Sequence, residues 1–464
     1  MFKEKIHIHF IGIGGAGMSG LAFILLGLGY KISGSDITSS KITKRLEDKG
    51  AIIFKGHNKK NIEGADLIVI SSAIPEDNLE IMEATEKNIK IIKRAEMLAK
   101  IMENKYGIAI AGTHGKTTTS SMISLLLEKS GLDPTVIVGG EVNNINGNAK
   151  LGYGKYVVAE ADESDGSFLK LNPLLGVITN IEDDHLDHYK NLENIIRDFK
   201  EFINRIPGNG SIILCKDCEN VRSLIQGYEK KYITYGISTE ANLMAKEIKF
   251  NQLSSDSQIY WKNIRIGGLH LNVPGSHNIL NALAAIAVGI ELGMKFNKIT
   301  KILASFQGVQ RRIEIIKKFD NQLLIIDDYA HHPTEIKVTL NAIRQSWKDK
   351  RIIVIFQPHR YSRTKLLAKK FGRVFFDADQ VIINDIYSAN ESPISGISGR
   401  TIFDEIIKAN HNHIKYIPSK DDTINYLCEI IQPDDIIVTM GAGDVWTIGQ
   451  ELIKQLKEVR NFIN

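Results

Sequence analysis

The feature of this sequence that most constrains its fold is a repeated alternation of short apolar runs with helix-like stretches. Most runs are bounded by glycine, aspartate, asparagine or serine, and most are followed by sequence with helical periodicity. This alternation predicts strand–helix–strand crossover units and mostly parallel sheets. Ligands of such sheets bind beyond the carboxyl ends of the strands, so function is expected just after each run. The predicted strands are IHIHFIGI, KISGSD, ADLIVISSA, GIAIAG, KYVVAEA, LGVITN, GSIIL, LLIIDD, RIIVIF, DQVIIND and DDIIVTMG.

The chain is long enough for several domains. Its 464 residues correspond to about two to four domains at roughly 100–200 residues each. Polar sequence near Glu103 and Glu314 predicts three α/β domains, at residues 1–103, 104–314 and 315–464. The stretch from Lys231 to Pro274 lacks helical periodicity and contains alternating pieces, so we predict an extra antiparallel sheet attached to the middle domain.

Composition excludes several classes of protein. The 58 Lys and Arg residues nearly balance 54 Asp and Glu residues, and no basic cluster indicates nucleic acid as a partner. Ile11 to Tyr30 carries no charge over about the length that crosses a bilayer, but its crowded glycines predict a tight turn leading into a buried helix from Gly15 to Gly29. The first ten residues lack the layout of a signal peptide, and three cysteines suit a reducing compartment. We therefore expect a cytoplasmic protein without a membrane partner.

A glycine-containing loop after the strand GIAIAG is the strongest chemical signal. It reads Gly112, Thr113, His114, Gly115, Lys116, Thr117, Thr118 and precedes a helix-like stretch. Backbone N–H groups of such a loop can close around phosphate oxygens at the start of the helix. Lys116 would then reach the outer phosphates, and the Thr117 hydroxyl would bind Mg²⁺. The loop is shorter than the standard pattern, because Ile110 stands where that pattern has a glycine.

A second glycine loop follows the first predicted strand. Gly12, Gly14 and Gly17 have the spacing G-x-G-x-x-G, which suggests a dinucleotide site when a carboxylate ends the next strand, as Asp36 does here. The same geometry binds the diphosphate of other nucleotides, including a UDP-sugar, and it also occurs as a purely structural turn. The loop alone leaves these alternatives open.

Carboxylates gather after two predicted strands. Glu160, Asp162, Glu163 and Asp165 follow KYVVAEA, while Glu182, Asp183 and Asp184 follow LGVITN. Carboxylates at one crevice repel one another unless a cation or protons intervene. Mg²⁺ is the natural cation beside a phosphate loop, and His185 could bind a second one. The alternative is a solvated acidic surface with helix-capping aspartates.

Three strand ends in the last third of the chain carry His, Tyr and Arg. LLIIDD is followed by YAHHP, RIIVIF by QPHRYSR, and DDIIVTMG by AGD. Arginine suits planar carboxylates because it offers paired N–H donors. The grouping favours a site that holds a carboxylate or an amine.

Together these segments resemble the Mur ligases. The matching segments span residues 12 to 445 in the family's order and cover nearly the whole chain: GIGGAGMSG, SGSD, AGTHGKTTT, VVAEADESDGSF, TNIEDDHLDHY, PGSHNILNALAA, GVQRRIE, DDYAHHPTEI, QPHRYSRT and GAGDV. The shortened phosphate loop is similar to the family's own form. Within the family, the chain looks like the members that join L-alanine to UDP-N-acetylmuramate.

The resemblance implies a fold and a reaction. It implies a Rossmann-like UDP-binding domain, a central P-loop ATPase domain and a Rossmann-like amino-acid domain, in a monomer or homodimer. ATP would phosphorylate the muramate carboxylate, and the amine of L-alanine would attack the acyl phosphate. A tetrahedral intermediate would then collapse to an amide, ADP and phosphate, in cytoplasmic peptidoglycan precursor synthesis. Charge on the transferred phosphoryl group calls for Mg²⁺ and for accurate positioning.

The resemblance also assigns roles residue by residue. Lys116 would hold the β- and γ-phosphates, Thr117 and Glu160 one Mg²⁺, and His185 a second. The remaining nucleotide contacts would be His277, Asn278 and Asn281 at adenine, Arg312 at phosphate and Asp328 at ribose. The muramoyl and alanine region would comprise Tyr329, His331, His359, Arg360 and Arg363. The UDP-sugar would contact Gly14, Gly15, Ala16, Gly17, Met18, Ser35, Asp36 and Ser71. The residues predicted to act in catalysis are Lys116, Glu160, His185, His331 and Arg363.

Three alternative functions remain. A related Mur ligase would add another amino acid or a peptide, although the relative that attaches a tripeptide lacks the first loop GIGGxGMSG. A nicotinamide-dependent oxidoreductase would use the Gly12–Gly17 loop and Asp36, but it leaves the loop AGTHGKTTT and the acidic stretch without a role. A non-catalytic nucleotide switch would use the phosphate loop alone.

Overall fold

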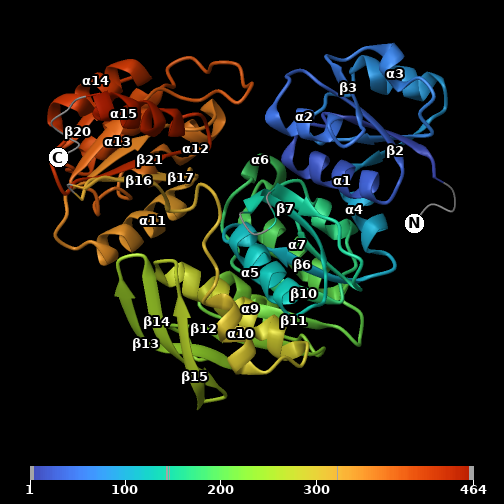
Figure 1. Cartoon of the computed structure of the whole chain (residues 1–464), viewed down its shortest axis with the longest axis horizontal. Helices are drawn as coiled ribbons and strands as arrows, with labels where there is room; N and C mark the ends of the chain where they lie inside the picture. The colour runs from blue at the N-terminus through green and yellow to red at the C-terminus, as the bar shows by residue number, and fades with distance from the viewer. Residues whose placement is uncertain (1–4, 143–144, 146, 321, 459–464) are drawn as a thin grey trace. The chain divides into compact units, whose positions relative to one another are not determined.

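A computed structural model describes residues 5–142, 145, 147–320 and 322–458, and these residues form an α/β protein (Figure 1). Its strands lie in three sheets, and the chain divides into two compact units. The first unit comprises residues 1–248, 256–271 and 278–307, and the second comprises residues 249–255, 272–277 and 308–464. The predicted architecture of crossover units and mostly parallel sheets is confirmed.

The N-terminal sheet has five strands, and all neighbouring strands are parallel. The order across the sheet is β3 (Ile52–Lys55), β2 (Lys31–Asp36), β1 (His7–Ile11), β4 (Leu67–Ile70) and β5 (Lys90–Lys93). The order reverses at β1, so the turn after β1 lies at the point where doubly wound sheets bind ligands. The predicted glycine loop occupies this turn.

The central sheet has ten strands. Their order is β15 (Ile264–Leu271), β14 (Ser254–Trp261), β13 (Leu243–Asn251), β12 (Tyr232–Gly236), β11 (Ser211–Cys215), β10 (Leu175–Ile178), β6 (Tyr106–Ala111), β9 (Tyr156–Glu160), β7 (Thr135–Val142) and β8 (Gly147–Lys150). The strands predicted between Lys231 and Pro274 are present, but the prediction of an extra antiparallel sheet was wrong in part: these strands extend the central sheet beyond β11, and β12 pairs parallel with both β11 and β13. The segment TVIVGGEV, which was not among the predicted strands, forms β7.

The third sheet has six strands and lies in the second unit. Their order is β16 (Glu314–Lys318), β17 (Leu324–Asp328), β21 (Ile436–Met440), β18 (Ile352–Phe356), β19 (Gln380–Ile383) and β20 (Ile414–Tyr416). β16 and β17 are antiparallel, and the other neighbours are parallel. Successive residues of β17 and β18 enter two hydrophobic clusters, with Ile326 and Val354 in one and Ile325 and Ile353 in the other, because side chains alternate between the faces of a strand.

Helices connect the strands. They are α1 (Ala16–Gly27), α2 (Lys41–Glu47), α3 (Leu79–Glu86), α4 (Arg94–Met102), α5 (Lys116–Lys129), α6 (Leu186–Tyr189), α7 (Leu192–Asn204), α8 (Glu219–Ile225), α9 (Ser276–Glu291), α10 (Phe296–Leu303), α11 (Pro333–Ser346), α12 (Tyr361–Phe371), α13 (Gly399–Lys408), α14 (Lys420–Ile430) and α15 (Trp446–Glu458). Over the described ranges, none of these helices combines the length and apolarity that a bilayer crossing requires.

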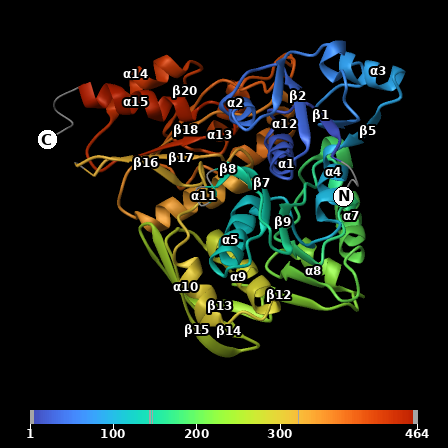
Figure 2. The same cartoon turned by 45° about the vertical axis from the view of Figure 1, so that its right-hand side comes forward.

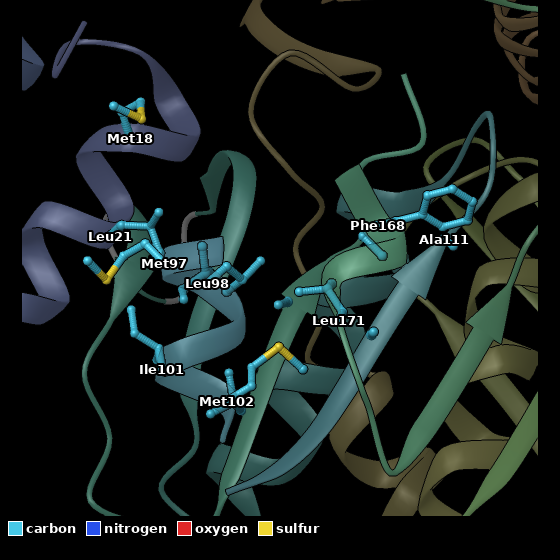
Figure 3. Packing of buried hydrophobic residues seen from close by; sticks show 14 of the residues in the cluster. Met18, Leu21, Met97, Leu98, Ile101, Met102, Ala111, Phe168 and Leu171 are labelled. Carbon is cyan, nitrogen blue, oxygen red and sulfur yellow. The ribbon is translucent and has the colours of Figure 1, made fainter. Parts of the chain in front are cut away.

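One hydrophobic cluster joins the first two sheets. Figure 3 shows Met18 and Leu21 of α1 beside Met97 of α4, and the same cluster continues to Phe168 and Leu171 in the middle of the chain. Helix α1 also packs on β7 and β8 (Figure 2). This packing explains the glycines inside α1, because a Cβ at Gly27 would lie 2.7 Å from Leu151 Cδ2. The uncharged run from Ile11 to Tyr30 is thus a buried strand end, a turn and a buried helix.

Candidate functional site

The phosphate loop joins β6 to α5 and turns on two glycines with positive φ. Gly112 has a φ of +132°, and a Cβ there would overlap the Thr179 hydroxyl and lie 2.9 Å from the Asn180 carbonyl oxygen. Gly115 has a φ of +82°, and a Cβ there would lie 2.7 Å from Asn281 Oδ1. Only glycine fits either position without strain. Both glycines therefore let the loop approach neighbouring segments closely.

The segment after β10 supports this loop from behind. Asn180 Oδ1 accepts the His114 N–H at 2.8 Å, and the Thr179 hydroxyl donates to the His114 carbonyl at 2.6 Å. Thr113 Oγ1 accepts the Glu182 N–H at 2.9 Å. These bonds connect the carboxyl ends of β6 and β10, which are neighbours in the sheet. The sequence analysis did not assign Asn180 a role, although it follows a predicted strand.

Lys116 begins α5, and its ammonium group is held inside the loop. It donates to the Gly112 carbonyl at 2.5 Å, to the Thr113 carbonyl at 3.3 Å and to Glu163 Oε1 at 2.7 Å. Burial is the largest single influence and lowers the pKa of Lys116, but the charge and hydrogen bond of Glu163, together with the charges of Asp162 and Glu160, outweigh it, so the pKa is raised overall and the ammonium stays charged. Thr118 follows in the first turn of α5 and is buried.

Thr117 and Glu160 lie together beside this lysine. Glu160 ends β9, its Oε1 accepts the Gly139 N–H at 2.8 Å, and it shares a hydrogen bond with the Thr117 hydroxyl. Burial raises the pKa of Glu160, although Gly139 and Lys116 oppose that shift. A hydroxyl at the start of a phosphate-binding helix and a partly buried carboxylate at the end of the neighbouring strand form a donor set that suits Mg²⁺. The two predicted ligands of the first cation are thus neighbours in space.

His185 reaches the same region from the loop after β10. It has a φ of +54° and caps α6, and its Nε2 lies 3.7 Å from Asp184 Oδ2. Its ring is close enough to Glu163 to oppose the burial-raised pKa of that carboxyl. The acidic groups after β9 and β10 therefore meet near one phosphate loop, as their positions at neighbouring strand ends predict.

The predicted adenine segment forms the start of α9. Asn281 Oδ1 accepts the Thr119 hydroxyl at 3.1 Å, and Asn281 Nδ2 donates to Asn278 Oδ1 at 3.3 Å. Asn281 thus lies against the phosphate loop and the helix that follows it. His277 belongs to the second unit, where burial and then the charge of Arg312 lower its pKa to about 4.

In the N-terminal sheet, the glycine loop is tied to Asp36. The Gly14 N–H donates to Asp36 Oδ2 at 2.9 Å, and a Cβ at Gly14 would lie 2.7 Å from the same oxygen. Gly15 caps α1, so the N–H groups of Ala16, Gly17 and Met18 occupy the first turn of the helix, where N–H groups have no helical partner. This turn is the part of the loop suited to a diphosphate. Ser71 follows β4 and lies beside Gly12.

Ser35 is another of the residues predicted to contact the UDP-sugar. It is fully buried, and its hydroxyl donates to Glu80 Oε2 at 2.5 Å. Burial of Glu80 would raise its pKa, but the nearby His9 ring and hydrogen bonds from Ser35 and Asn61 lower the pKa to about 2. The Ser35 carbonyl accepts the Gly12 N–H at 2.9 Å. The side chain of Ser35 therefore points into the interior and supports the loop from behind, so the predicted contact of this residue with uridine or the sugar gains no support from its burial.

Arg94 is a residue that the sequence analysis missed. Its Nη2 donates to Asp162 Oδ2 at 2.7 Å, and its side chain lies against Gly17, where a Cβ would be 3.0 Å from Arg94 Nη1. Arg94 thus connects the N-terminal glycine loop with the acidic stretch after β9. The partners are 68 residues apart in the chain, and no local pattern marks their pairing.

In the second unit, Asp328 is the last residue of β17, and it is buried. Its Oδ2 accepts the Ile313 N–H at 2.8 Å, and its Oδ1 accepts the Ala330 N–H at 2.7 Å. Burial raises the pKa of Asp328 to about 6, although Arg312 opposes that shift. Arg312 also donates to Glu335 Oε1 at 3.3 Å. Asp328 and Arg312, which are the predicted contacts of ribose and phosphate, therefore lie close enough to interact electrostatically.

The predicted amino-acid residues gather at the carboxyl ends of β17 and β18. The rings of His331 and His359 are 5.8 Å apart, and Arg363 Nη1 donates to His359 Nδ1 at 3.3 Å. Tyr329 and His331 rings meet edge to face at 5.4 Å. Arg360 has a φ of +70° and donates its N–H to the Tyr387 carbonyl. These residues form one rim, which we call the His–Arg rim: Tyr329, His331, His359, Arg360 and Arg363.

The two histidines of the His–Arg rim should be neutral near pH 7. Burial lowers the pKa of His331 to about 3 and, with Arg363 and Arg360, that of His359 to about 4. An unfolded histidine titrates near 6.5, so folding loses stability as pH falls below 6.5 toward these values. We expect the ring NMR signals of both, assigned with His→Gln variants, to keep their neutral positions between pH 8 and 5.5. A midpoint near 6.5 for either would contradict this environment.

Comparison with known proteins adds independent findings. Three family models match the chain, described as Mur ligase family, catalytic domain (residues 7–106), Mur ligase middle domain (110–289) and Mur ligase, glutamate ligase domain (311–443). The UDP-N-acetylmuramate–L-alanine ligase of Pelotomaculum thermopropionicum is 49% identical, and the match covers 98% of this chain and 98% of the relative. The ligase of the same name from Syntrophotalea carbinolica is also 49% identical, and the match covers 99% of this chain and 100% of the relative. Among solved structures, UDP-N-acetylmuramate–alanine ligase of Thermotoga maritima has a TM-score of 0.84 at 28% identity, over 98% of this chain and 100% of that chain. A murein peptide ligase of Psychrobacter arcticus has a TM-score of 0.72 at 25% identity, over 97% and 98%.

Proposed function

This chain belongs to the Mur ligase family, and we propose that it joins L-alanine to the carboxylate of UDP-N-acetylmuramate with ATP as the phosphoryl donor. The observation that carries this proposal is the phosphate loop with Lys116 set beside buried acidic groups, in a chain similar over its full length to ligases of that name. The activity is that of an ATP-dependent carboxylate–amine ligase.

The chemistry explains why a nucleotide is consumed. A carboxylate is a poor acyl donor because its leaving group would be oxide. Transfer of the γ-phosphoryl group from ATP to a carboxylate oxygen gives an acyl phosphate and ADP. The alanine amine then attacks the acyl carbon, and the tetrahedral intermediate loses phosphate and a proton to leave the amide. Most of the catalysis in such a transfer comes from positioning and charge stabilisation.

The residues of the first unit would act on the nucleotides. Lys116 would bind the outer phosphates of ATP, and Asn281 with Asn278 would contact adenine. The first turn of α1, from Ala16 to Met18, would bind the UDP diphosphate, while Asp36 fixes the Gly14 end of the loop.

The donor set also fits divalent cations. The Thr117 hydroxyl and Glu160 would hold one Mg²⁺, and His185 would bind a second. Glu163 Oε2, which is buried and has no hydrogen-bond partner within the described ranges, adds negative potential at this point. Bound Mg²⁺ would neutralise phosphate oxygens during transfer. The proposed roles of the His–Arg rim are to orient alanine and the muramoyl group.

We also propose that the enzyme works in the cytoplasm, as a monomer or homodimer. The three cysteines, Cys215, Cys218 and Cys428, are free, which fits a reducing compartment. All proposed site residues come from one chain. Size-exclusion chromatography with light scattering would measure the oligomeric state.

The direct test is a phosphate-release assay. Purified protein with ATP, Mg²⁺, UDP-N-acetylmuramate and L-alanine should release phosphate, and mass spectrometry should show the amide product. An alanine-free reaction is the control, and no release above it would reject the proposal. Replacing alanine by other amino acids or by a tripeptide tests whether the protein is a related ligase with another substrate. Titration with NADH tests the oxidoreductase alternative, which predicts that the dinucleotide binds and that UDP-N-acetylmuramate does not.

Arg363→Ala should raise the apparent KM for alanine more than that for ATP. Arg363 bonds to His359 within the His–Arg rim, and a guanidinium suits the alanine carboxylate. Steady-state kinetics with each substrate varied in turn would measure both constants. An equal rise in the two KM values would argue against a local carboxylate contact. Arg400→Ala, at an arginine paired with Asp404 on α13, is a matched control outside the rim.

A further inference from the structure

Glu163 was assigned above only a contribution to the negative potential, yet its carboxylate is the side chain to which Lys116 donates a hydrogen bond. An ammonium group has three N–H donors, and Lys116 directs them to the Gly112 carbonyl, the Thr113 carbonyl and Glu163 Oε1. All three donors therefore have acceptors within the protein. A phosphate oxygen can bind Lys116 only if it replaces one of these acceptors.

Glu163 is the acceptor whose replacement has the largest consequence. Its side chain is 3% exposed, and its Oε2 has no hydrogen-bond partner within the described ranges. The Tyr189 hydroxyl donates to its backbone carbonyl, which fixes the residue in place. Burial raises the pKa of Glu163, while Lys116 opposes that shift. Without Lys116, a buried carboxylate would be left with little compensation, and such a state is strongly unfavourable.

The groups around Glu163 determine what can compensate its negative charge when Lys116 leaves. The charge of Asp162 acts on Glu163 and raises its pKa, while Lys116 and the His185 ring oppose that shift. Nucleotide phosphates bring further negative charge. A divalent cation that arrives with the phosphates would restore the balance at this carboxylate.

We propose that Glu163 is a positioning residue that holds Lys116 in the phosphate loop and releases it to nucleotide phosphates, so that the Lys116–Glu163 pair competes with nucleotide binding, most strongly when no divalent cation is present. This proposal rests on the nucleotide site of the proposed function. Because the ion pair is a competing arrangement of Lys116, nucleotide binding must overcome it. Without a cation, release of Lys116 leaves the buried charge of Glu163 uncompensated, whereas a cation that arrives with the phosphates compensates it.

The test compares Glu163→Gln with wild type in binding ADP, measured by calorimetry in EDTA and in saturating Mg²⁺. Glutamine keeps the size of the side chain and removes its charge. We expect Glu163→Gln to bind ADP in EDTA about tenfold more tightly than wild type, with a difference below about threefold in Mg²⁺. Asp165→Asn is the matched control, because Asp165 lies in the same acidic stretch and accepts the Ser167 N–H, which asparagine can also accept.

A second measurement follows Lys116 directly. In nucleotide-free protein, acetic anhydride should modify Lys116 faster in Glu163→Gln than in wild type, since the ammonium loses its charged partner; mass spectrometry reports the rate. Should this variant fail to fold, Glu163→Asp replaces it, because its shorter side chain weakens the same contact and should change both readouts in the same direction.

Three results would overturn the proposal. They are ADP binding in EDTA that is no tighter in Glu163→Gln, an equal gain in Asp165→Asn, and unchanged modification of Lys116. Each leaves the ligase assignment intact, because wild-type phosphate release tests that assignment separately. Absence of ADP binding by the wild type would instead reject the nucleotide site itself.

Discussion

Lys116→Ala should lower turnover at least about a hundredfold, which corresponds to about 2.7 kcal/mol at 1.36 kcal/mol per decade. Lys116 is the cation at the start of α5, and its ammonium lies within the loop that would surround the phosphates. Alanine removes the positive charge that would stabilise the transferred phosphoryl group. Initial rates of phosphate release at saturating substrates would measure the effect.

The interpretation of this variant depends on its stability. Without Lys116 the buried Glu163 loses its charged partner, and breaking a buried pair can cost about 3–5 kcal/mol. Lys116→Ala combined with Glu163→Gln removes that penalty and serves as the control. If turnover stays low in the double variant while its thermal unfolding matches wild type, the loss is catalytic. Near-wild-type turnover in the single variant would show that the loop has another role.

The sequence predicted the interior strands of the sheets better than the strands at the sheet edges. Several interior strands are apolar along their whole length, as in β18, where every residue is buried, and such runs are recognisable without any structural context. β3 and β5 are short edge strands of the N-terminal sheet with exposed ends. Their sequences, IIFK and KIIK, are too short to be separated from helical or loop sequence by periodicity.

The sequence could predict which residues lie close together when they follow neighbouring strands of one sheet. It could not predict proximity that depends on a side-chain partner far away in the chain. Lys116, Thr117 and Glu160 lie together because β6 and β9 are neighbouring parallel strands. The family resemblance placed Ser35 at the nucleotide, but four of the six residues of β2 are buried, so no alternation in the sequence shows which way its hydroxyl points. Arg94 and Glu163 take their significance from partners far away in sequence, which a single sequence does not reveal. The domain boundaries near Glu103 and Glu314 and the roles of the site residues stay predictions.

Gly112→Ala should disable the nucleotide site more completely than any other single methyl group added to this loop. Gly112 combines a φ of +132° with close contact to the segment after β10. The unfavourable backbone conformation and the overlap with Thr179 and Asn180 together should cost about 3 kcal/mol or more, by lower stability or by displacement of the loop. Since a displacement of about 1 Å at a catalytic site can cost about a hundredfold in rate, we expect at least that loss in turnover.

Gly131→Ala separates the two causes. Gly131 also has positive φ, at +80°, but no atom lies within 4 Å of a Cβ built there. It should therefore carry only the backbone penalty, about 1–2 kcal/mol, with turnover near wild type. Thermal unfolding and phosphate release of both variants would measure the difference. If Gly112→Ala behaved like Gly131→Ala in both assays, the close approach between the loop and the Thr179–Asn180 segment would not matter for nucleotide binding. The bonds from that segment to His114 would then lose their significance for the shape of the phosphate loop.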